Sequence, residues 1–340
     1  MLPTRNTMSA GIDLYCPSMN PSSISMSSST QTTSPGDGTP LWLRFALFCT
    51  LFMLATLWLE PHLTPLCRVT ANHVGELLNL VGRSPLVQGD LITLSGFTVR
   101  IVTECTPLYA CLLHGAFVLA QPASWCRTLT GLCLGGLAIA AFNLLRIAFI
   151  IAAGPFVSTL LFDILHVYLG QVAMLLQVVT SALVWQRWSV NAPSPFPFLL
   201  RAACVATLLF VPWVLVNRSY VSLLDNLVAG LFSLLYPGNQ LLIPRPLVIY
   251  NHTFAVPLFL ALILAGRDSW TINRFAAIVG GVYSIAAWHI LFRVTHVIWT
   301  ALGVTAIVPL HQGIYLLGQF LLPFLLWLWL DGGLFLQARS

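Results

Sequence analysis

Residues 128–153 read TLTGLCLGGLAIAAFNLLRIAFIIAA, an apolar run with a single charged residue, Arg146. The run is long enough for a helix to cross a hydrocarbon core of about 30 Å. Gly154-Pro155 follows the run, and Gly with a following Pro is a common end of a helix. The stretch therefore predicts a transmembrane helix that ends at Gly154.

Apolar runs of this kind recur through the rest of the chain. The 340 residues are 58% hydrophobic and 7% charged, with a mean hydropathy of +0.87, whereas a soluble domain has about 25% charged residues. We therefore predict an all-α polytopic membrane protein with about eight transmembrane helices. The expected spans are residues 41–59, 107–120, 128–153, 166–185, 198–216, 254–265, 275–300 and 313–330.

The runs fall into two blocks, a first membrane domain at 41–190 and a second membrane block at 197–335. Residues 1–40 precede them and are rich in Ser, Thr, Pro and Gly, a composition typical of a disordered tail. Residues 91–102, just ahead of Cys105, read as an extended, β-prone segment.

Charge and cysteine content exclude several classes of protein. The net charge is +5, but the basic residues are arginines scattered singly between the apolar runs, which argues against a nucleic-acid partner. The eight Cys residues form no CxxC pair and most lie in apolar runs, which argues against a metal site and a disulfide framework. Most of these Cys are interpreted as small core hydrophobes.

The distribution of arginine predicts the orientation in the membrane. The positive-inside rule assigns the side with more arginines to the cytoplasm. That assignment places Cys105 and His166 near the external face. The expected cytoplasmic set is Arg44, Arg127, Arg187, Arg201, Arg267, Arg274 and Arg339.

The second block echoes the first. Cys105 and Arg146 are 41 residues apart, as are His252 and Arg293. An Ile-Ala-Ala triplet precedes both arginines, and His311 takes the place of His166. The pattern predicts an internal duplication that forms two four-helix repeats in parallel orientation. The alternative is that two sets of apolar helices match by chance.

Cys105, Arg146 and His166 form a candidate catalytic set. Cys105 precedes Thr106-Pro107, a good helix start, and the N-terminal dipole of a helix favours a thiolate. The neighbouring Glu104 opposes the thiolate, so a cation is needed, and Arg146 is the best candidate. Arg146 lies about 12 Å inside the end of its helix, where an unpaired charge is costly.

Three further residues are supporting candidates beside this set. Asn143 is three residues before Arg146 and shares its helix face. Asp163 precedes His166 and is expected to cap the next helix or to orient the imidazole. Glu104, next to Cys105, is the third supporting residue.

His166 itself is a natural proton shuttle near neutral pH. The alternative for the whole set is that Cys105 is a packing residue, Arg146 an anchor and His166 an interfacial side chain.

The order of these residues resembles the exosortase/archaeosortase family of membrane transpeptidases. That family has a Cys just ahead of a span, Asn-x-x-Arg in the next long span, and His-x-x-x-Gly opening the one after. The matching residues are Cys105, Asn143 with Arg146, and His166 with Gly170. This sequence departs from the family in Thr106-Pro107 after the Cys and in its second block, where His252 stands at the nucleophile position. The second repeat is therefore interpreted as degenerate.

The resemblance implies a cysteine peptidase of the prokaryotic plasma membrane with its active site near the external face. Its substrates would be exported proteins that carry a C-terminal sorting signal, consisting of a short motif, one transmembrane helix and a basic tail. Cys105 would form a thioester, Arg146 would stabilise the thiolate or the oxyanion, and His166 would protonate the leaving amine. The thioester would pass to an acceptor, and no metal or organic cofactor is needed.

Two other functions fit the same sequence. A transporter with two parallel repeats would bind an anionic substrate through Arg146 and Arg293. A non-catalytic assembly factor would need none of the catalytic set. Cys105 separates these readings, because a carrier tolerates Ala at this position and a transpeptidase does not.

Overall fold

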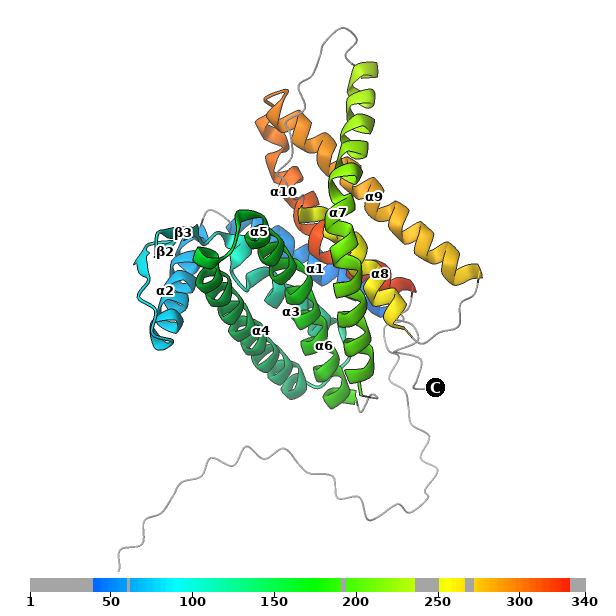
Figure 1. Ribbon diagram of the computed structural model, residues 1–340. Coiled ribbons are helices and arrows are strands. Elements are labelled where there is room, and N and C mark those ends of the chain that lie inside the picture. The colour runs from blue at the N-terminus through cyan, green and yellow to red at the C-terminus, as the bar shows by residue number, and fades with distance from the viewer. Residues whose placement is uncertain (1–38, 60–61, 191–193, 236–250, 267–271, 331–340) are drawn as a thin grey trace, which may run out of the picture. The chain divides into compact units, whose positions relative to one another are not determined.

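The computed structural model describes residues 39–59, 62–190, 194–235, 251–266 and 272–330. Most of the expected tail at 1–40 and the end of the second block at 331–335 lie outside these residues. The described chain is helical apart from one small sheet (Figure 1). The predicted helical polytopic membrane fold is thereby confirmed.

Five segments of the described chain are long and apolar enough to cross a membrane. They contain α1 (Leu41–Leu59), α4 (Trp125–Ala153), the pair α5 (Thr159–Val167) and α6 (Met174–Val190), α7 (Phe196–Leu235) and α9 (Ile272–Thr300). The other expected spans are also helical but shorter, and the total of eight crossings stays a prediction. They are α3 (Leu108–Ala120), α8 (Ala255–Ala265), α10 (Val308–Leu316) and α11 (Leu322–Leu330).

Helix α7 extends beyond the expected end at residue 216. It has 40 residues and is therefore about 60 Å long, twice the hydrocarbon thickness. Its second half carries buried apolar residues at helical spacing, Val221, Leu224, Val228 and Phe232, and Val228 and Phe232 pack with Val297 of α9. This packing explains why the helix continues beyond the expected span 198–216.

Two other helices differ from the expected spans. The polar stretch after residue 62 contains α2 (Thr64–Leu80), which begins with Pro65 in its first turn. The helix that carries His166 begins earlier than expected, at Thr159, where the Ser158 side chain accepts a hydrogen bond from the Leu161 N–H. Ser158, and not Asp163, caps this helix.

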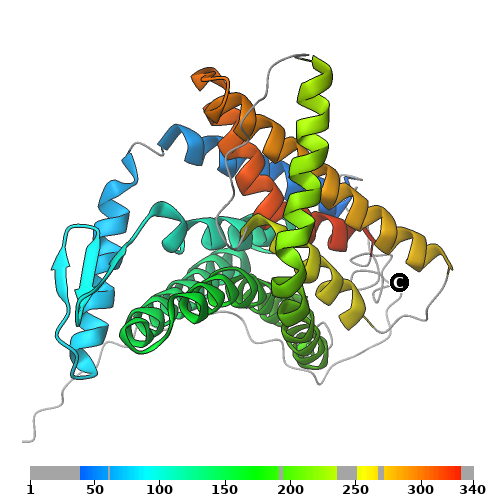
Figure 2. The same ribbon diagram turned by 45° about the horizontal axis from the view of Figure 1, so that its top comes forward.

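A three-stranded antiparallel sheet precedes Cys105, which confirms the expected extended segment. Its strands are β1 (Leu86–Gln88), β2 (Leu91–Leu94) and β3 (Phe97–Arg100), paired in that order. They lie along α2 (Figure 2). Ile92 and Leu94 are buried against apolar side chains of α2 and against Ile147 and Ile151 of α4. The sheet is thereby fixed against the part of α4 that follows Arg146.

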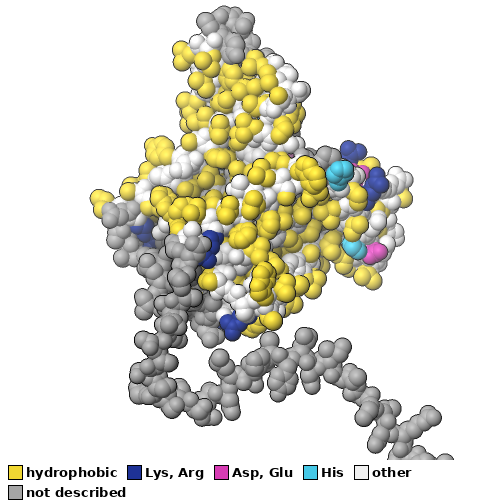
Figure 3. All heavy atoms as spheres, turned by 180° about the vertical axis from the view of Figure 1, so that it is seen from behind, with side chains coloured by type: hydrophobic (Ala, Val, Ile, Leu, Met, Phe, Trp, Pro, Cys, Tyr) yellow, Lys and Arg dark blue, Asp and Glu magenta, His cyan; other side chains and the backbone are white. Residues whose placement is uncertain are grey.

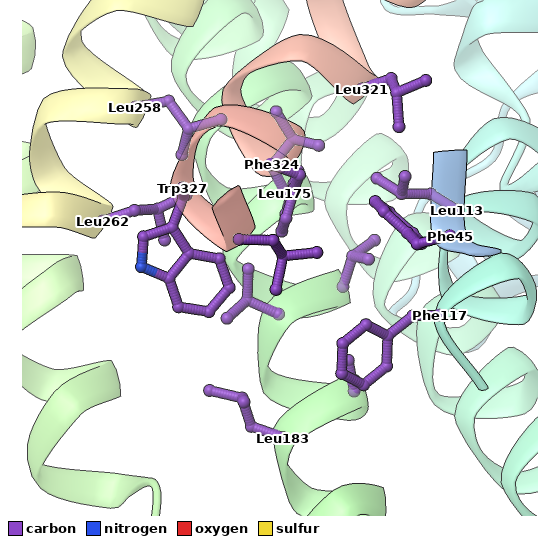
Figure 4. Packing of buried hydrophobic residues seen from close by; sticks show 14 of the residues in the cluster. Phe45, Leu113, Phe117, Leu175, Leu183, Leu258, Leu262, Leu321, Phe324 and Trp327 are labelled. Atoms are coloured by element: carbon purple, nitrogen blue, oxygen red, sulfur yellow. The ribbon is translucent and has the colours of Figure 1, made fainter. Parts of the chain in front are cut away.

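The core of the first domain surrounds the short helix α3. It packs against α1, α4 and α6, and in the second block α8 packs in the same way against α7, α9 and α11. Gly135 of α4 leaves the space that the His114 ring of α3 occupies, since a Cβ at Gly135 would lie 2.0 Å from His114 Nε2. Figure 4 shows part of the shared core, with Phe45, Leu113, Phe117, Leu175, Leu183, Leu258, Leu262, Leu321, Phe324 and Trp327.

The surface fits a lipid environment. Hydrophobic side chains are spread over the face shown in Figure 3, and charged ones are few. Large apolar residues on the long helices are exposed, among them Leu137 of α4 and Leu208 of α7. Soluble monomers rarely expose apolar surface on this scale.

Candidate active site

Cys105 lies at the end of a short 3₁₀ turn, Thr103–Cys105, between the sheet and α3. Its N–H donates to the Val102 carbonyl at 2.9 Å. Thr106 closes the turn by donating from Oγ1 to the Thr103 carbonyl at 2.6 Å, and its Oγ1 accepts from the Leu108 N–H at 3.4 Å. The expected helix start beside Cys105 is therefore present, and α3 begins at Leu108.

A chain of hydrogen bonds connects this turn to α4. Asn143 Nδ2 donates to the carbonyl oxygen of Cys105 at 2.9 Å, and Arg146 Nη2 donates to Asn143 Oδ1 at 3.0 Å. Asn143 is fully buried. Because Nδ2 and Oδ1 of the Asn143 amide are both hydrogen-bonded, the side chain fixes the Cys105 backbone and the Arg146 guanidinium relative to each other.

Arg146 is buried and keeps hydrogen-bonding capacity. Only 7% of the residue is exposed, and its Nε atom has no hydrogen-bond partner. No ion pair to Arg146 is present in the described part of the chain, but its charge acts on Cys105 and on His166. A buried guanidinium without a carboxylate is costly, and the arrangement suits an anion that forms beside it.

His166 lies on α5. Its imidazole, like the Cys105 thiol, interacts with the charge of Arg146. Its ring stacks on Phe162 at 5.8 Å between centroids, and its Nδ1 is buried without a hydrogen-bond partner. Two residues after His166, α5 gives way to a π-helical turn, Tyr168–Ala173, and such turns are frequent at functional sites. A Cβ at Gly170 in this turn would lie 3.0 Å from Arg146 Nη1, so Gly170 admits the guanidinium.

The two ends of the candidate set do not touch. Both Cys105 and His166 interact electrostatically with Arg146, but no hydrogen bond joins the thiol to the imidazole among the described residues. Hydrogen bonds used in catalysis often form only when substrate is bound. Arg146 is therefore the member of the set whose charge acts on both of the other two residues.

Burial raises the pKa of the Cys105 thiol above its ordinary value, and the neighbouring Glu104 and Cys67 raise it further. A backbone hydrogen bond from Val102 and the charge of Arg146 both lower the pKa, but they do not offset the burial. At neutral pH the resting residue is therefore a thiol. The thiolate expected from the sequence requires a base or a further stabilising contact.

The supporting candidates have different surroundings. Asn143 is part of the hydrogen-bond chain described above. Glu104 is exposed and acts on the thiol only by opposing its ionisation. Asp163 lies one helical turn before His166 and its charge acts on the imidazole, which leaves orientation, and not capping, as its expected role.

The second block contains a corresponding arginine with different partners. Arg293 is fully buried and forms an ion pair with Asp225 of α7, at 2.6 Å from Nη2 to Oδ1. Its Nη1 donates to His296 Nδ1 at 2.9 Å. His311 Nδ1 is 3.0 Å from Thr295 Oγ1, and the ring stacks on Phe292. The side chain of His252 lies outside the described residues.

Three residues near the site were not recognised as candidates from the sequence. Phe162 stacks on His166, and Phe97 of β3 packs edge-on against Phe162 at 4.9 Å. Gly154 makes room for Phe97, since a Cβ there would lie 2.4 Å from the Phe97 ring. The spacing of four residues between Phe162 and His166 on one helix was the available signal, whereas nothing local indicates Phe97.

Comparison with known protein families gives a match to the first domain. The model of the transmembrane exosortase family matches residues 33–180, which include Cys105, Asn143, Arg146 and His166. No curated protein and no solved structure matches the chain. The second block, from residue 197, lies outside the matched segment. Residues 33–180 of this multi-pass membrane protein are therefore similar to the transmembrane exosortase family.

Proposed function

We propose that this chain is a membrane cysteine transpeptidase that cleaves the C-terminal sorting signals of exported proteins and transfers the shortened proteins to an acceptor. Cys105 is the nucleophile, Arg146 the electrostatic stabiliser and His166 the proton carrier. The site faces the exterior of a prokaryotic plasma membrane, where the tailed substrate presents its extramembrane motif. The acceptor is an amine or water.

The reaction begins with the Cys105 thiol, because burial disfavours the thiolate at rest. His166 takes the thiol proton as sulfur attacks the scissile carbonyl carbon, and the carbonyl oxygen gains the negative charge. The C–N bond then breaks, and His166 returns the proton to the leaving amine. The acylated Cys105 thioester remains until the acceptor attacks, when its proton passes back through His166 to the sulfur.

Arg146 supports both charged stages of this reaction. Its positive charge already lowers the pKa of Cys105, and its Nε atom is a donor without a partner. A donor placed in advance near the developing oxyanion contributes about 10²–10³ in rate in other acyl-transfer enzymes. The observation that carries the proposal is the hydrogen-bond chain from Arg146 through Asn143 to Cys105.

The carrier alternative requires the two arginines to have similar roles. Arg293 is neutralised by Asp225 at 2.6 Å, whereas Arg146 has no ion-pair partner in the described residues. This difference favours the enzyme. The carrier becomes the better account if both arginines prove equally important for one transported anion.

The test is mass spectrometry of tailed surface proteins from cells that carry the wild type or Cys105→Ala at equal membrane abundance. We expect processed C-termini with the wild type and intact tails with the variant. Cys133→Ser is the matched control, because Cys133 is an exposed free thiol on α4, and it should process normally. Equal processing by the wild type and Cys105→Ala would refute the proposal.

A further inference from the structure

We propose that the outer edge of β3 binds the extramembrane segment of the substrate as an added β-strand and guides it to Cys105. The occupant is an extended polypeptide recognised mainly through its backbone. This inference rests on the proposed function and adds the mode of substrate binding. It assigns a role to the sheet, which the chemistry at Cys105, Arg146 and His166 does not require.

The register of the hairpin determines which backbone groups of β3 face outward. The turn residues Ser95 and Gly96 have φ values of 50° and 81°, as a two-residue type I′ turn requires. In such a hairpin the closing pair, Leu94 and Phe97, exchanges hydrogen bonds, and every second pair along the ladder does the same. The Ile101 N–H donates to the Asp90 carbonyl at 2.8 Å, which continues this alternation.

Thr98 and Arg100 occupy the alternate, non-hydrogen-bonded pairs with β2. Their N–H and C=O groups therefore point away from β2, toward the outer edge. No backbone hydrogen bond occupies these groups in the described residues, and both residues are exposed. An exposed edge with unpaired groups at every second residue is a template for an extended peptide.

The same edge leads to the sulfur of Cys105. Val102 is also extended, with φ −101° and ψ 170°, so its N–H continues the series of Thr98 and Arg100 along the edge. The Cys105 N–H donates to the Val102 carbonyl at 2.9 Å, so the edge strand continues directly into the turn that carries Cys105. A peptide that pairs with Thr98 and Arg100 therefore runs directly toward the nucleophile.

One face of the sheet is packed against the rest of the protein, so the free edge of β3 is the part of the sheet that continues toward the thiol. Ile92 and Leu94 point into the cluster formed with α2 and α4, and Val87 of β1 fills the space beside Gly75. The edge of β1 is also the farther one, because β2 lies between it and β3. Arg100 adds a charged side chain that is 65% exposed, with Asp90 at 3.6 Å.

The first test replaces Thr98 by Pro, which removes the outward N–H without removing a hydrogen bond to β2. Proline is tolerated on edge strands at such positions. We expect processing of the substrate identified with Cys105→Ala to fall about tenfold or more through a higher KM. Thr93→Val on β2 is the matched control, because it loses the same 3.0 Å contact between Thr93 Oγ1 and Thr98 Oγ1 and leaves the β3 edge unchanged, and it should stay within about twofold of wild type.

A second measurement does not depend on the proline variant and tests the edge even if that variant misfolds. Thr98→Cys in the Cys105→Ala background is combined with single cysteines at successive substrate residues before the cleavage site. A paired strand predicts disulfide crosslinks at every second substrate position. Uniform crosslinking, or none, would overturn the edge-binding model.

The outcomes separate the two proposals. Loss of processing in Cys105→Ala together with full processing in Thr98→Pro would refute only the binding edge. Equal processing in the wild type and Cys105→Ala would refute the enzyme, and the binding edge with it. Loss in both variants, with alternate crosslinks, supports both.

Discussion

Helices α4 and α9 have the same plan in the two halves of the molecule. Each has 29 residues, with arginines at its third and twenty-second positions, Arg127 and Arg146 in α4 and Arg274 and Arg293 in α9. The first arginine of each donates to a carbonyl near the end of another helix, at Ser189 and Ile263. The helix after each is interrupted by a π-helical turn that contains Leu-Gly-Gln. These shared features support the predicted internal duplication, which stays a proposal.

The two halves differ in the surroundings of the second arginine. Arg146 faces a thiol and has a free Nε donor, whereas Arg293 is bound by the carboxylate of Asp225. Asp225 is available because α7 continues as a helix to Leu235. The same helix plan therefore carries two differently paired arginines. Among the described residues Arg146 has no carboxylate partner and can interact with an anion, whereas Arg293 is neutralised by Asp225.

The largest expected effect comes from removing each arginine. Arg146→Gln should lower processing by about 10²–10³, because the oxyanion loses its donor and charge. The double variant Asp225→Asn with Arg293→Gln removes a neutral pair and should retain most activity. Mass spectrometry of substrate C-termini, at equal membrane abundance, measures both. Equal losses of processing in the two variants would show that the two arginines have similar roles, and would favour the carrier.

A second test uses the glycines of the two π-helical turns. Gly170→Ala places a Cβ 3.0 Å from Arg146 Nη1 and should lower processing about tenfold by displacing the guanidinium, with little change in melting temperature. Gly318→Ala would meet the Trp288 ring at 2.2 Å and should mainly lower the melting temperature in detergent. Gly136→Ala, where a Cβ meets nothing within 4 Å, is the neutral control. An active Gly170→Ala protein would contradict the placement of Arg146.

The smallest expected effect concerns the pH dependence of Cys105 alkylation. Burial raises the pKa of this thiol, so its reaction with iodoacetamide should keep accelerating above pH about 8.5, the ordinary thiol pKa. Arg146→Gln removes a charge that lowers the pKa, so alkylation at a given pH should become slower still, by a few-fold. Peptide mass spectrometry gives both rates. Faster alkylation in the variant would show that Arg146 does not favour the thiolate.

Much of the scaffold could be predicted from the sequence, because membrane helices are encoded locally. The apolar run 128–153 and Gly154-Pro155 predicted the end of α4 correctly, at Ala153. The packing role of Gly154 could not be predicted. The Phe97 ring occupies the space that a side chain at Gly154 would fill, and Phe97 is far away in sequence. Its φ of −47° shows that it does not end the helix by a left-handed turn.

The candidate site shows the same division between local and distant information. The spacing of Asn143 and Arg146 predicted a shared helix face, and the hydrogen bond between them confirms it. The sequence prediction began this helix at residue 166, where an apolar run starts, and did not recognise Ser158 as an N-cap. His166 therefore lies inside the helix and not at its start. The neutralisation of Arg293 was also missed, because Asp225 lies 68 residues away on a helix whose second half looked polar.

The most direct test of the account is to find the acyl group on Cys105. Membranes that process substrate are quenched in acid, and the peptide that contains Cys105 is analysed by mass spectrometry. The account predicts an added mass equal to the substrate segment before the cleavage site, which neutral hydroxylamine removes. Continued processing with no adduct on Cys105, or with the adduct on another cysteine, would contradict it.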